Sequence, residues 1–118
     1  MWKYSILLTL FVFCLPALAH DISGKWDFAV ETDAGGGSPK FEFKQEGEKL
    51  TGTYSGMFGE AKVVGTVKGD RVEFSFAFSA QGESGKAIYK GTIESATRMK
   101  GEVEFPGFAK GTWIGTKQ

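Results

Sequence analysis

The stretch VEFSFAF, residues 72–78, carries an apolar side chain at every second position and a small or charged side chain between them. Successive side chains of a β-strand point to opposite faces, so Val72, Phe74, Phe76 and Phe78 would share one face. On a helix, strict alternation would spread these apolar side chains over two opposite sides instead of gathering them in one stripe. It therefore predicts a strand with one aromatic, buried face and one exposed face.

The same alternation runs along most of the chain. Short turn-like connectors rich in Gly, Asp, Glu and Ser separate the alternating segments and leave no room for crossover helices, so consecutive strands should pair as antiparallel neighbours. We predict an all-β fold, a single eight-stranded antiparallel up-and-down (meander) β-barrel; a two-sheet β-sandwich is the alternative. The eight segments are 24–30, 40–44, 50–55, 62–67, 72–78, 87–93, 98–105 and 109–115.

Glycines recur on the predicted inward face. Six times a glycine precedes an aromatic or branched residue by two positions, which puts both on the same side of a strand. Inward glycines let barrel strands bend and leave space for large side chains from elsewhere in the barrel, so the repeat favours the barrel over the sandwich. The pairs are Gly24/Trp26, Gly52/Tyr54, Gly65/Val67, Gly91/Ile93, Gly101/Val103 and Gly111/Trp113.

The N-terminus has the features of a signal peptide, predicted as residues 1–19. Lys3 precedes an apolar run over 6–18, and Ala17-Leu18-Ala19 is the small-x-small pattern at which cleavage after Ala19 is expected. The run is short for a membrane span, although an uncleaved anchor is the alternative. Residues 20–118 would then form one secreted or periplasmic domain. Cys14 would be removed, so the domain would contain no disulfide and no cysteine-based metal site.

Composition argues against several classes of function. The formal net charge of the 118-residue chain is zero, and no basic stripe suggests nucleic-acid binding. The one histidine, His20, stands at the expected start of the domain, where a histidine-brace metal site would need a second histidine. No Ser/His/Asp, Cys/His or paired-carboxylate set can be assembled. We expect no enzyme activity, no cofactor and no metal. The stretch 33–37, DAGGG, is read as a flexible linker rather than a calcium loop.

Two short motifs carry a family resemblance. Ser23-Gly24-Lys25-Trp26, followed by LTGTYS at 50–55, resembles the opening of calycin-type barrels, the lipocalins and avidins. A closer resemblance is to small uncharacterised secreted bacterial β-domains that repeat a Thr-Gly-Thr motif and end in a segment like GTWIGTK at 111–117. The resemblance implies a lipocalin- or avidin-like barrel. It does not imply biotin binding, because the strands after Tyr54 lack the tryptophans that wall the avidin site. Lipocalins usually pair the first-strand tryptophan with a late arginine, for which the last strand here offers only Lys117.

The predicted interior points to ligand binding without catalysis. Eight strands enclose a space that side chains just fill or that one small ligand occupies. The polar groups expected inside are the hydroxyls of Tyr54 and Tyr89 and the indole N–H groups of Trp26 and Trp113, and we predict these four as ligand-binding residues. A ligand would be small and mostly apolar, with one or two hydrogen-bonding atoms. The alternative is a solid, fully packed core.

The connectors differ between the two ends of the predicted meander. Tight turns near 46–48, 69–70 and 94–96 would lie at one end, and longer, looser loops at 33–39, 56–60, 80–85 and 106–108 at the other. Met57, Phe58 and Phe108 lie on the longer loops, as a binding mouth or folded inward as a plug. The alternative function is a protein-interaction or inhibitor module at this end. A membrane-spanning barrel is disfavoured, because the outward face is rich in Lys, Glu and Thr.

Overall fold

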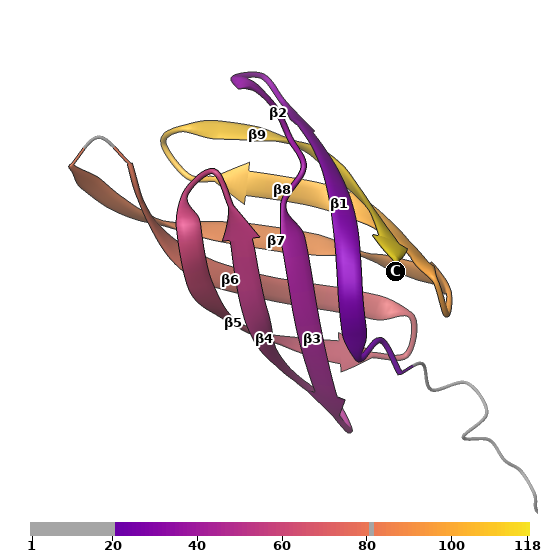
Figure 1. The fold of residues 1–118 in the computed structure, drawn as a ribbon. Helices are drawn as coiled ribbons and strands as arrows, with labels where there is room; N and C mark the ends of the chain where they lie inside the picture. The colour runs from indigo at the N-terminus through magenta and orange to yellow at the C-terminus, as the bar shows by residue number, and fades with distance from the viewer. Residues whose placement is uncertain (1–20, 81) are drawn as a thin grey trace, which may run out of the picture.

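The protein is described by a computed structural model that places residues 21–80 and 82–118 (Figure 1). The predicted signal peptide 1–19, with Cys14, and His20 lie outside the described residues. No helix long and apolar enough to span a membrane occurs in the described part of the chain. The strands are β1 (Gly24–Thr32), β2 (Gly35–Gly37), β3 (Lys40–Glu46), β4 (Lys49–Gly56), β5 (Gly59–Lys68), β6 (Arg71–Ala80), β7 (Glu83–Ser95), β8 (Arg98–Phe105) and β9 (Ala109–Lys117).

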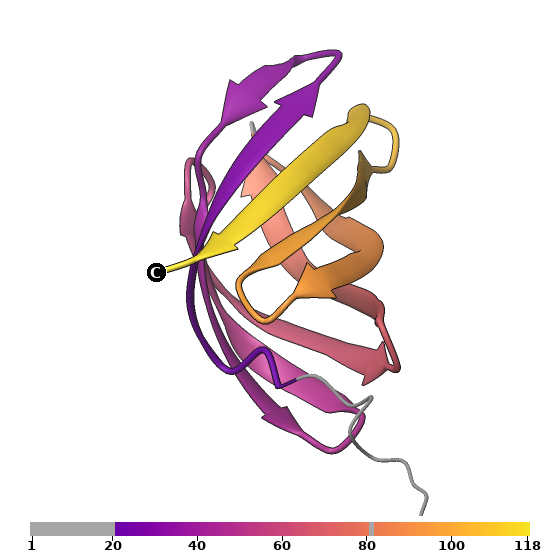
Figure 2. The same cartoon turned by 90° about the vertical axis from the view of Figure 1, so that its right-hand side faces the viewer.

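Eight long strands close into an antiparallel up-and-down barrel. Each strand pairs with its neighbours in the order β1-β3-β4-β5-β6-β7-β8-β9, and β9 returns to pair with β1 over seven residue pairs, from Trp26↔Lys117 to Thr32↔Gly111. Figure 2 shows β9 lying between β1 and β8. The predicted barrel is confirmed, and the two-sheet sandwich is wrong, because the β1–β9 ladder joins the two edges that a sandwich would leave open.

Alternation of side chains divides the barrel into an apolar interior and a polar exterior. The inward face predicted for each of the eight segments is confirmed: its apolar side chains are buried or half-buried, while their neighbours in sequence are mostly exposed. No charged side chain is buried among the described residues. The buried set extends two residues beyond the prediction: Ile22, which precedes the first alternating segment, is fully buried, and Pro39, which precedes the second, is also buried.

The inward glycines sit where neighbouring strands come unusually close. A Cβ atom added to Gly65, Gly101 or Gly111 would lie 2.0, 1.9 or 1.8 Å from a carbonyl oxygen of the adjacent strand. At Gly91 it would also lie 2.6 Å from the Trp113 ring, two strands away. The glycines therefore permit both the close strand approach of a tightly coiled barrel and the packing of large rings over their backbone.

The end of the barrel that carries the tight turns is sealed. Two-residue connections join β3 to β4, β5 to β6 and β7 to β8 there. Ile22 crosses this end, where its backbone N–H donates to Gln45 Oε1 (2.9 Å) and its carbonyl accepts from Trp26 Nε1 (2.9 Å). Lys117 lies opposite Trp26 in the β1–β9 ladder. We call this the closed end and the other the open end.

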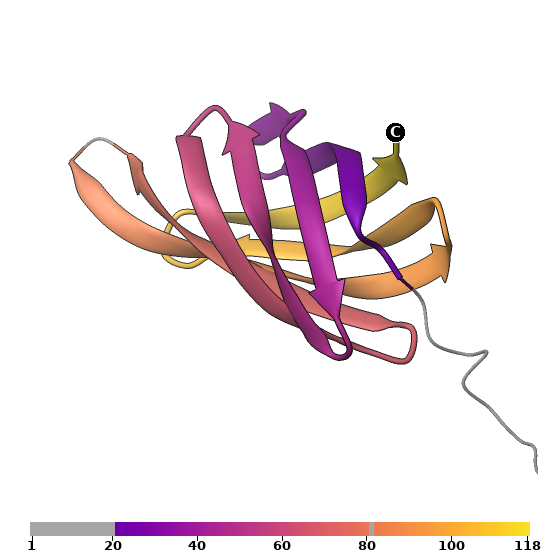
Figure 3. The same ribbon diagram turned by 60° about the horizontal axis from the view of Figure 1, so that its bottom comes forward.

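Two of the four loops predicted at the open end are shorter than expected, whereas the loop at 106–108 has the predicted length. The β4–β5 and β6–β7 connections have two residues each, because these strands run beyond the predicted segments. The β5–β6 ladder stops at Val64↔Ser75 while the β6–β7 ladder continues to Ala80↔Glu83, so the β6–β7 hairpin projects past its neighbours (Figure 3). The linker predicted at 33–37 is also wrong in part, since Gly35–Gly37 forms β2 against β1.

Candidate functional site

A pocket of about 390 Å³ opens at the open end of the barrel. Three parts of the chain enclose it: the end of β1 with the β2 segment and Pro39, the β4–β5 hairpin, and the end of β8 with the start of β9. Tyr89 on β7 reaches it from below. Among the described residues, the lining is Val30, Thr32, Ala34, Gly35, Gly36, Gly37, Ser38, Pro39, Tyr54, Gly56, Met57, Phe58, Tyr89, Phe105, Phe108 and Ala109.

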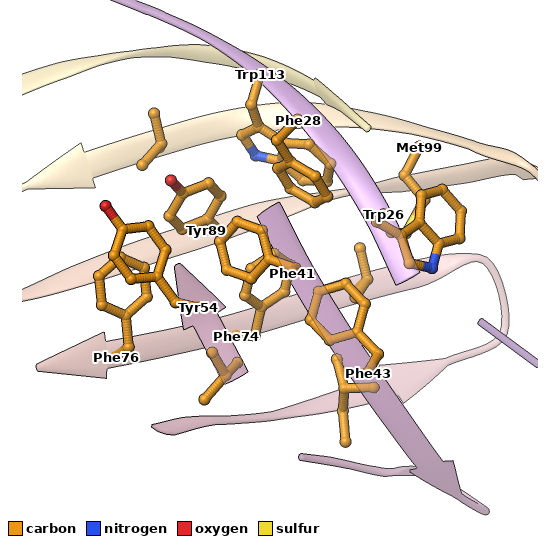
Figure 4. Close-up of a cluster of buried hydrophobic side chains, with 14 of the residues drawn as sticks. Trp26, Phe28, Phe41, Phe43, Tyr54, Phe74, Phe76, Tyr89, Met99 and Trp113 are labelled. Atoms are coloured by element: carbon orange, nitrogen blue, oxygen red, sulfur yellow. The ribbon is translucent and has the colours of Figure 1, made fainter. Parts of the chain in front are cut away.

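Two tyrosines form the floor of the pocket. Tyr54 and Tyr89 are only 3% and 1% exposed, yet their hydroxyl oxygens point in the same direction, away from the closed end where Trp26 lies (Figure 4). Each phenol ring is stacked on a phenylalanine of β6. The Tyr54 ring lies 4.0 Å from that of Phe76 at 16°, and the Tyr89 ring lies 4.9 Å from that of Phe74 at 14°. The stacking fixes both rings, so the hydroxyls are held in position before any ligand arrives.

The two hydroxyls are neutral and only partly satisfied by the protein. The backbone N–H of Phe58 donates a long hydrogen bond of 3.4 Å to Tyr54 Oη. No partner for Tyr89 Oη is found in the ranges 21–80 and 82–118, and this atom is not sealed from solvent. Burial raises the pKa of Tyr54, against a small opposing effect of the Phe58 N–H. Burial, and then the nearby Tyr54, raises the pKa of Tyr89 strongly. Both groups therefore stay protonated at neutral pH.

The upper wall of the pocket is backbone-rich and uncharged. Thr32 Oγ1 donates to the carbonyl of Gly35 (2.6 Å) and accepts from the N–H of Ala34 (3.0 Å), which folds the β2 segment back beside β1. No Asp, Glu, Lys, Arg or His belongs to the described lining. An ionised ligand would therefore lose its hydration without gaining a counter-charge, which is strongly unfavourable.

The three residues predicted for the looped end all line the pocket, but in different ways. Met57 is 75% exposed and Phe108 54% exposed at its rim, while Phe58 is half-buried. Phe58 packs against Phe78 (ring centroids 4.8 Å apart) and Phe105 (5.8 Å). The three residues therefore divide between the two predicted arrangements: Phe58 folds inward, and Met57 and Phe108 remain at the rim of the pocket.

The two tryptophans predicted as ligand contacts lie elsewhere. Trp26 is at the closed end, and Trp113 lies below the pocket, stacked on Phe28 at 4.8 Å. Neither is among the described residues that line the pocket. The indole N–H of Trp26 donates to the Ile22 carbonyl, and that of Trp113 to the Glu102 carbonyl (2.9 Å). Of the four predicted ligand-binding residues, the structure therefore brings only Tyr54 and Tyr89 to the pocket. The indole N–H groups of the two tryptophans are already hydrogen-bonded to backbone carbonyls.

Below the tyrosines the barrel is filled with aromatic rings. Phe41 lies at the centre, with ring centroids 4.5 Å from Phe28, 5.3 Å from Phe74 and 5.4 Å from Tyr89. The predicted alternatives of a cavity and a packed core therefore apply to different parts of the barrel. Aromatic rings pack against one another in the middle of the barrel, Ile22 and Trp26 are fully buried at the closed end, and the pocket lies at the open end. No cluster of three or more His, Cys, Asp or Glu side chains is placed to hold a metal within the described ranges.

Comparisons with known proteins bear on the fold. Neither a scan against protein-family models nor a search of curated proteins found a match. Among solved structures, the chain is similar to one described as EF1p2_mFAP2b bound to DFHBI, with a TM-score of 0.59 and 18% sequence identity over 82% of this chain and 94% of that one. That structure is a lipocalin-like barrel. This chain has the same fold. The eight-stranded antiparallel barrel that the resemblance implied is thus confirmed.

Proposed function

We propose that the protein binds a small, mostly apolar molecule in the pocket at the open end of its barrel and carries out no catalysis. The observation that carries this proposal is the pocket itself, an uncharged space of about 390 Å³ above a pair of fixed tyrosine hydroxyls. Ligand pockets commonly occupy about 300–1,000 Å³, are largely apolar and contain a few placed polar groups. The structural neighbour, described as bound to DFHBI, adds support by analogy of fold.

We further propose that the chain is exported and acts outside the cytoplasm, in the periplasm or beyond the cell. The N-terminal signal-like segment motivates this proposal. Fractionation of the producing cells, with N-terminal sequencing of the mature protein, tests it. Protein that remains in the cytoplasm with residues 1–19 attached would contradict it.

Native mass spectrometry of the protein purified from its own producing cells tests ligand binding. We expect a reproducible mass excess that disappears on denaturation. The matched variants are Ala109→Phe, which adds a ring inside the pocket, and Ala29→Phe, which adds the same ring on the exposed face of β1. The excess should be lost in the first variant and kept in the second. A bare mass in the unmodified protein, unchanged after exposure to apolar aromatic compounds, would contradict the proposal.

A second candidate function is a protein-interaction or inhibitor module. The observation that favours it is the exposure of Met57 and Phe108 at the rim, since exposed large apolar groups commonly mark contact surfaces. In that case Met57→Ser with Phe108→Ser would abolish capture of the partner, whereas Ala109→Phe inside the pocket would leave it intact. Ligand binding predicts the opposite ranking of the two changes.

A further inference from the structure

We infer that the two tyrosine hydroxyls at the pocket floor select ligands that carry a carbonyl oxygen, with Tyr54 and Tyr89 as the specificity-determining residues. This inference rests on the proposed function and extends it from an apolar ligand to a neutral, ring-sized carbonyl compound. Its basis is the hydrogen-bonding capacity that each hydroxyl has left, the charge state of the two groups and the way their rings are held.

Both hydroxyls have a proton to donate and no acceptor for it among the residues that the structure describes. A tyrosine hydroxyl offers one donor and can accept. One acceptor position of Tyr54 Oη is taken by the Phe58 N–H at 3.4 Å, and no acceptor for its proton occurs within residues 21–80 and 82–118. Tyr89 Oη has neither a hydrogen-bond donor nor an acceptor as a partner within the same two ranges. Leaving a donor unpaired under a bound ligand is costly, so a ligand oxygen that accepts is favoured over a hydrocarbon surface.

The charge state of the floor favours a neutral ligand. The raised pKa values of both tyrosines keep them as phenols, which donate, rather than phenolates, which would repel an acceptor oxygen. A carboxylate would receive the same two donors. However, no lysine, arginine or histidine of the described lining would offset its desolvation. The oxygen of a ketone, quinone or amide accepts hydrogen bonds from both hydroxyls and carries no net charge.

The two donors are preorganised. Phe76 and Phe74 stack on the two phenol rings, and Gly56 lies directly beside the Tyr54 hydroxyl, where an added Cβ would come within 2.5 Å of Oη. The rings therefore have little freedom to lose when a ligand binds, and the hydrogen bonds contribute to affinity with a small ordering cost. The other side-chain hydroxyls of the described lining belong to Ser38 and to Thr32, whose proton is donated to the Gly35 carbonyl.

A matched pair of probes tests the inference: 9-fluorenone and fluorene share a ring system and differ in one carbonyl oxygen. Binding of each to the full-length expressed protein is measured by quenching of intrinsic fluorescence, with Tyr54→Phe, Tyr89→Phe and the double variant alongside. We expect fluorenone to bind more tightly than fluorene. Each substitution should weaken fluorenone binding about two- to tenfold, the range for one neutral hydrogen bond. The same substitutions should not weaken fluorene binding, because fluorene offers the hydroxyls no acceptor.

The infrared carbonyl band of bound fluorenone gives a second readout that does not depend on affinity. The band should shift to lower frequency in the unmodified protein and return toward its position in hydrocarbon solvent in the double variant. Equal binding of the two probes, or an unshifted band, would overturn the carbonyl inference while leaving ligand binding standing. Failure of both probes to bind would overturn the inference and the proposed function together.

Discussion

Gly101→Ala is a direct test of how the barrel is built. Gly101 lies on β8 opposite Gly91 of β7, and a Cβ atom added there would come within 1.9 Å of the Lys90 carbonyl oxygen and 2.5 Å of the Gly91 Cα. Real Cβ contacts essentially never fall below 3.0 Å. The atoms that must give way belong to the backbone of β7, which is hydrogen-bonded on both sides, so the two strands must separate by about an ångström.

The expected cost follows from that clash. Overpacking a well-packed interior costs about 1–3 kcal/mol, and the upper end applies here because no flexible side chain can move aside. Replacing glycine also reduces the conformational entropy of the unfolded chain, which offsets about 0.4–1 kcal/mol of this cost. We expect Gly101→Ala to lower the free energy of unfolding by about 2–3 kcal/mol. At about 4–8 °C per kcal/mol, Tm should fall by roughly 8–24 °C.

The matched control is Gly37→Ala in β2. Its φ is not positive, and the nearest atom to an added Cβ is Pro39 Cδ at 4.0 Å, an ordinary contact. Its free energy of unfolding should change by no more than about 0.5 kcal/mol. Both variants are measured by thermal denaturation followed by far-ultraviolet circular dichroism. Equal melting temperatures for the two variants would refute the argument that close strand approach requires glycine at position 101.

Three further predictions concern the core, the closed end and the titration of the pocket floor. Phe76→Ala should lower the free energy of unfolding by about 3–5 kcal/mol, because it removes a buried ring. The control Glu73→Ala, at an exposed position of the same strand, should change it by at most about 0.5 kcal/mol. Comparable denaturation midpoints for the two variants would contradict the assignment of the strand faces. Ile22→Ala should cost about 2–5 kcal/mol in the same assay, and a cost no larger than that of Glu73→Ala would show that this residue does not seal the barrel. The difference between the spectrophotometric titrations of the unmodified protein and of Tyr89→Phe should show that the Tyr89 phenolate forms well above the ordinary pKa of 10.0. The stability contributed by neutral Tyr89 should be fully present below pH 10.0, the pKa in the unfolded chain, and be lost as the pH rises through the raised pKa of the folded state. Titration at the ordinary value would mean that burial does not hold this phenol neutral.

Most of the fold could be predicted from the alternation of apolar and polar residues, because a single physical rule links this alternation to burial. In a closed barrel with an apolar interior, parity along each strand decides which side chain is buried, so the inward sets of all eight segments could be assigned from the sequence. The same rule cannot find strand ends that extend past the buried core. It also fails for β2, whose three glycines have no side-chain pattern and which forms through backbone pairing with β1.

The candidate site could be predicted only in part. Parity placed Tyr54 and Tyr89 inside, but it says nothing about height along the barrel axis, and height separates these tyrosines from Trp113 and Trp26. The use of both indole N–H groups by backbone carbonyls depends on chain geometry that no spacing records. Ile22 has the same parity as Gly24 and Trp26, so the first alternating segment could have been extended to it, but the pattern does not show that the chain crosses the end of the barrel there.

The measurement that tests the central claim most directly is methyl NMR of the full-length expressed protein titrated with 9-fluorenone. The methyl groups of Val30, Met57 and Ala109 line the pocket, whereas those of Val72 and Ile93 are buried near the closed end. If the open end is a ligand-binding pocket, saturable shift changes should be confined to the first group and be lost in Ala109→Phe. No saturable change in the first group, or changes centred on Val72 and Ile93, would contradict the account.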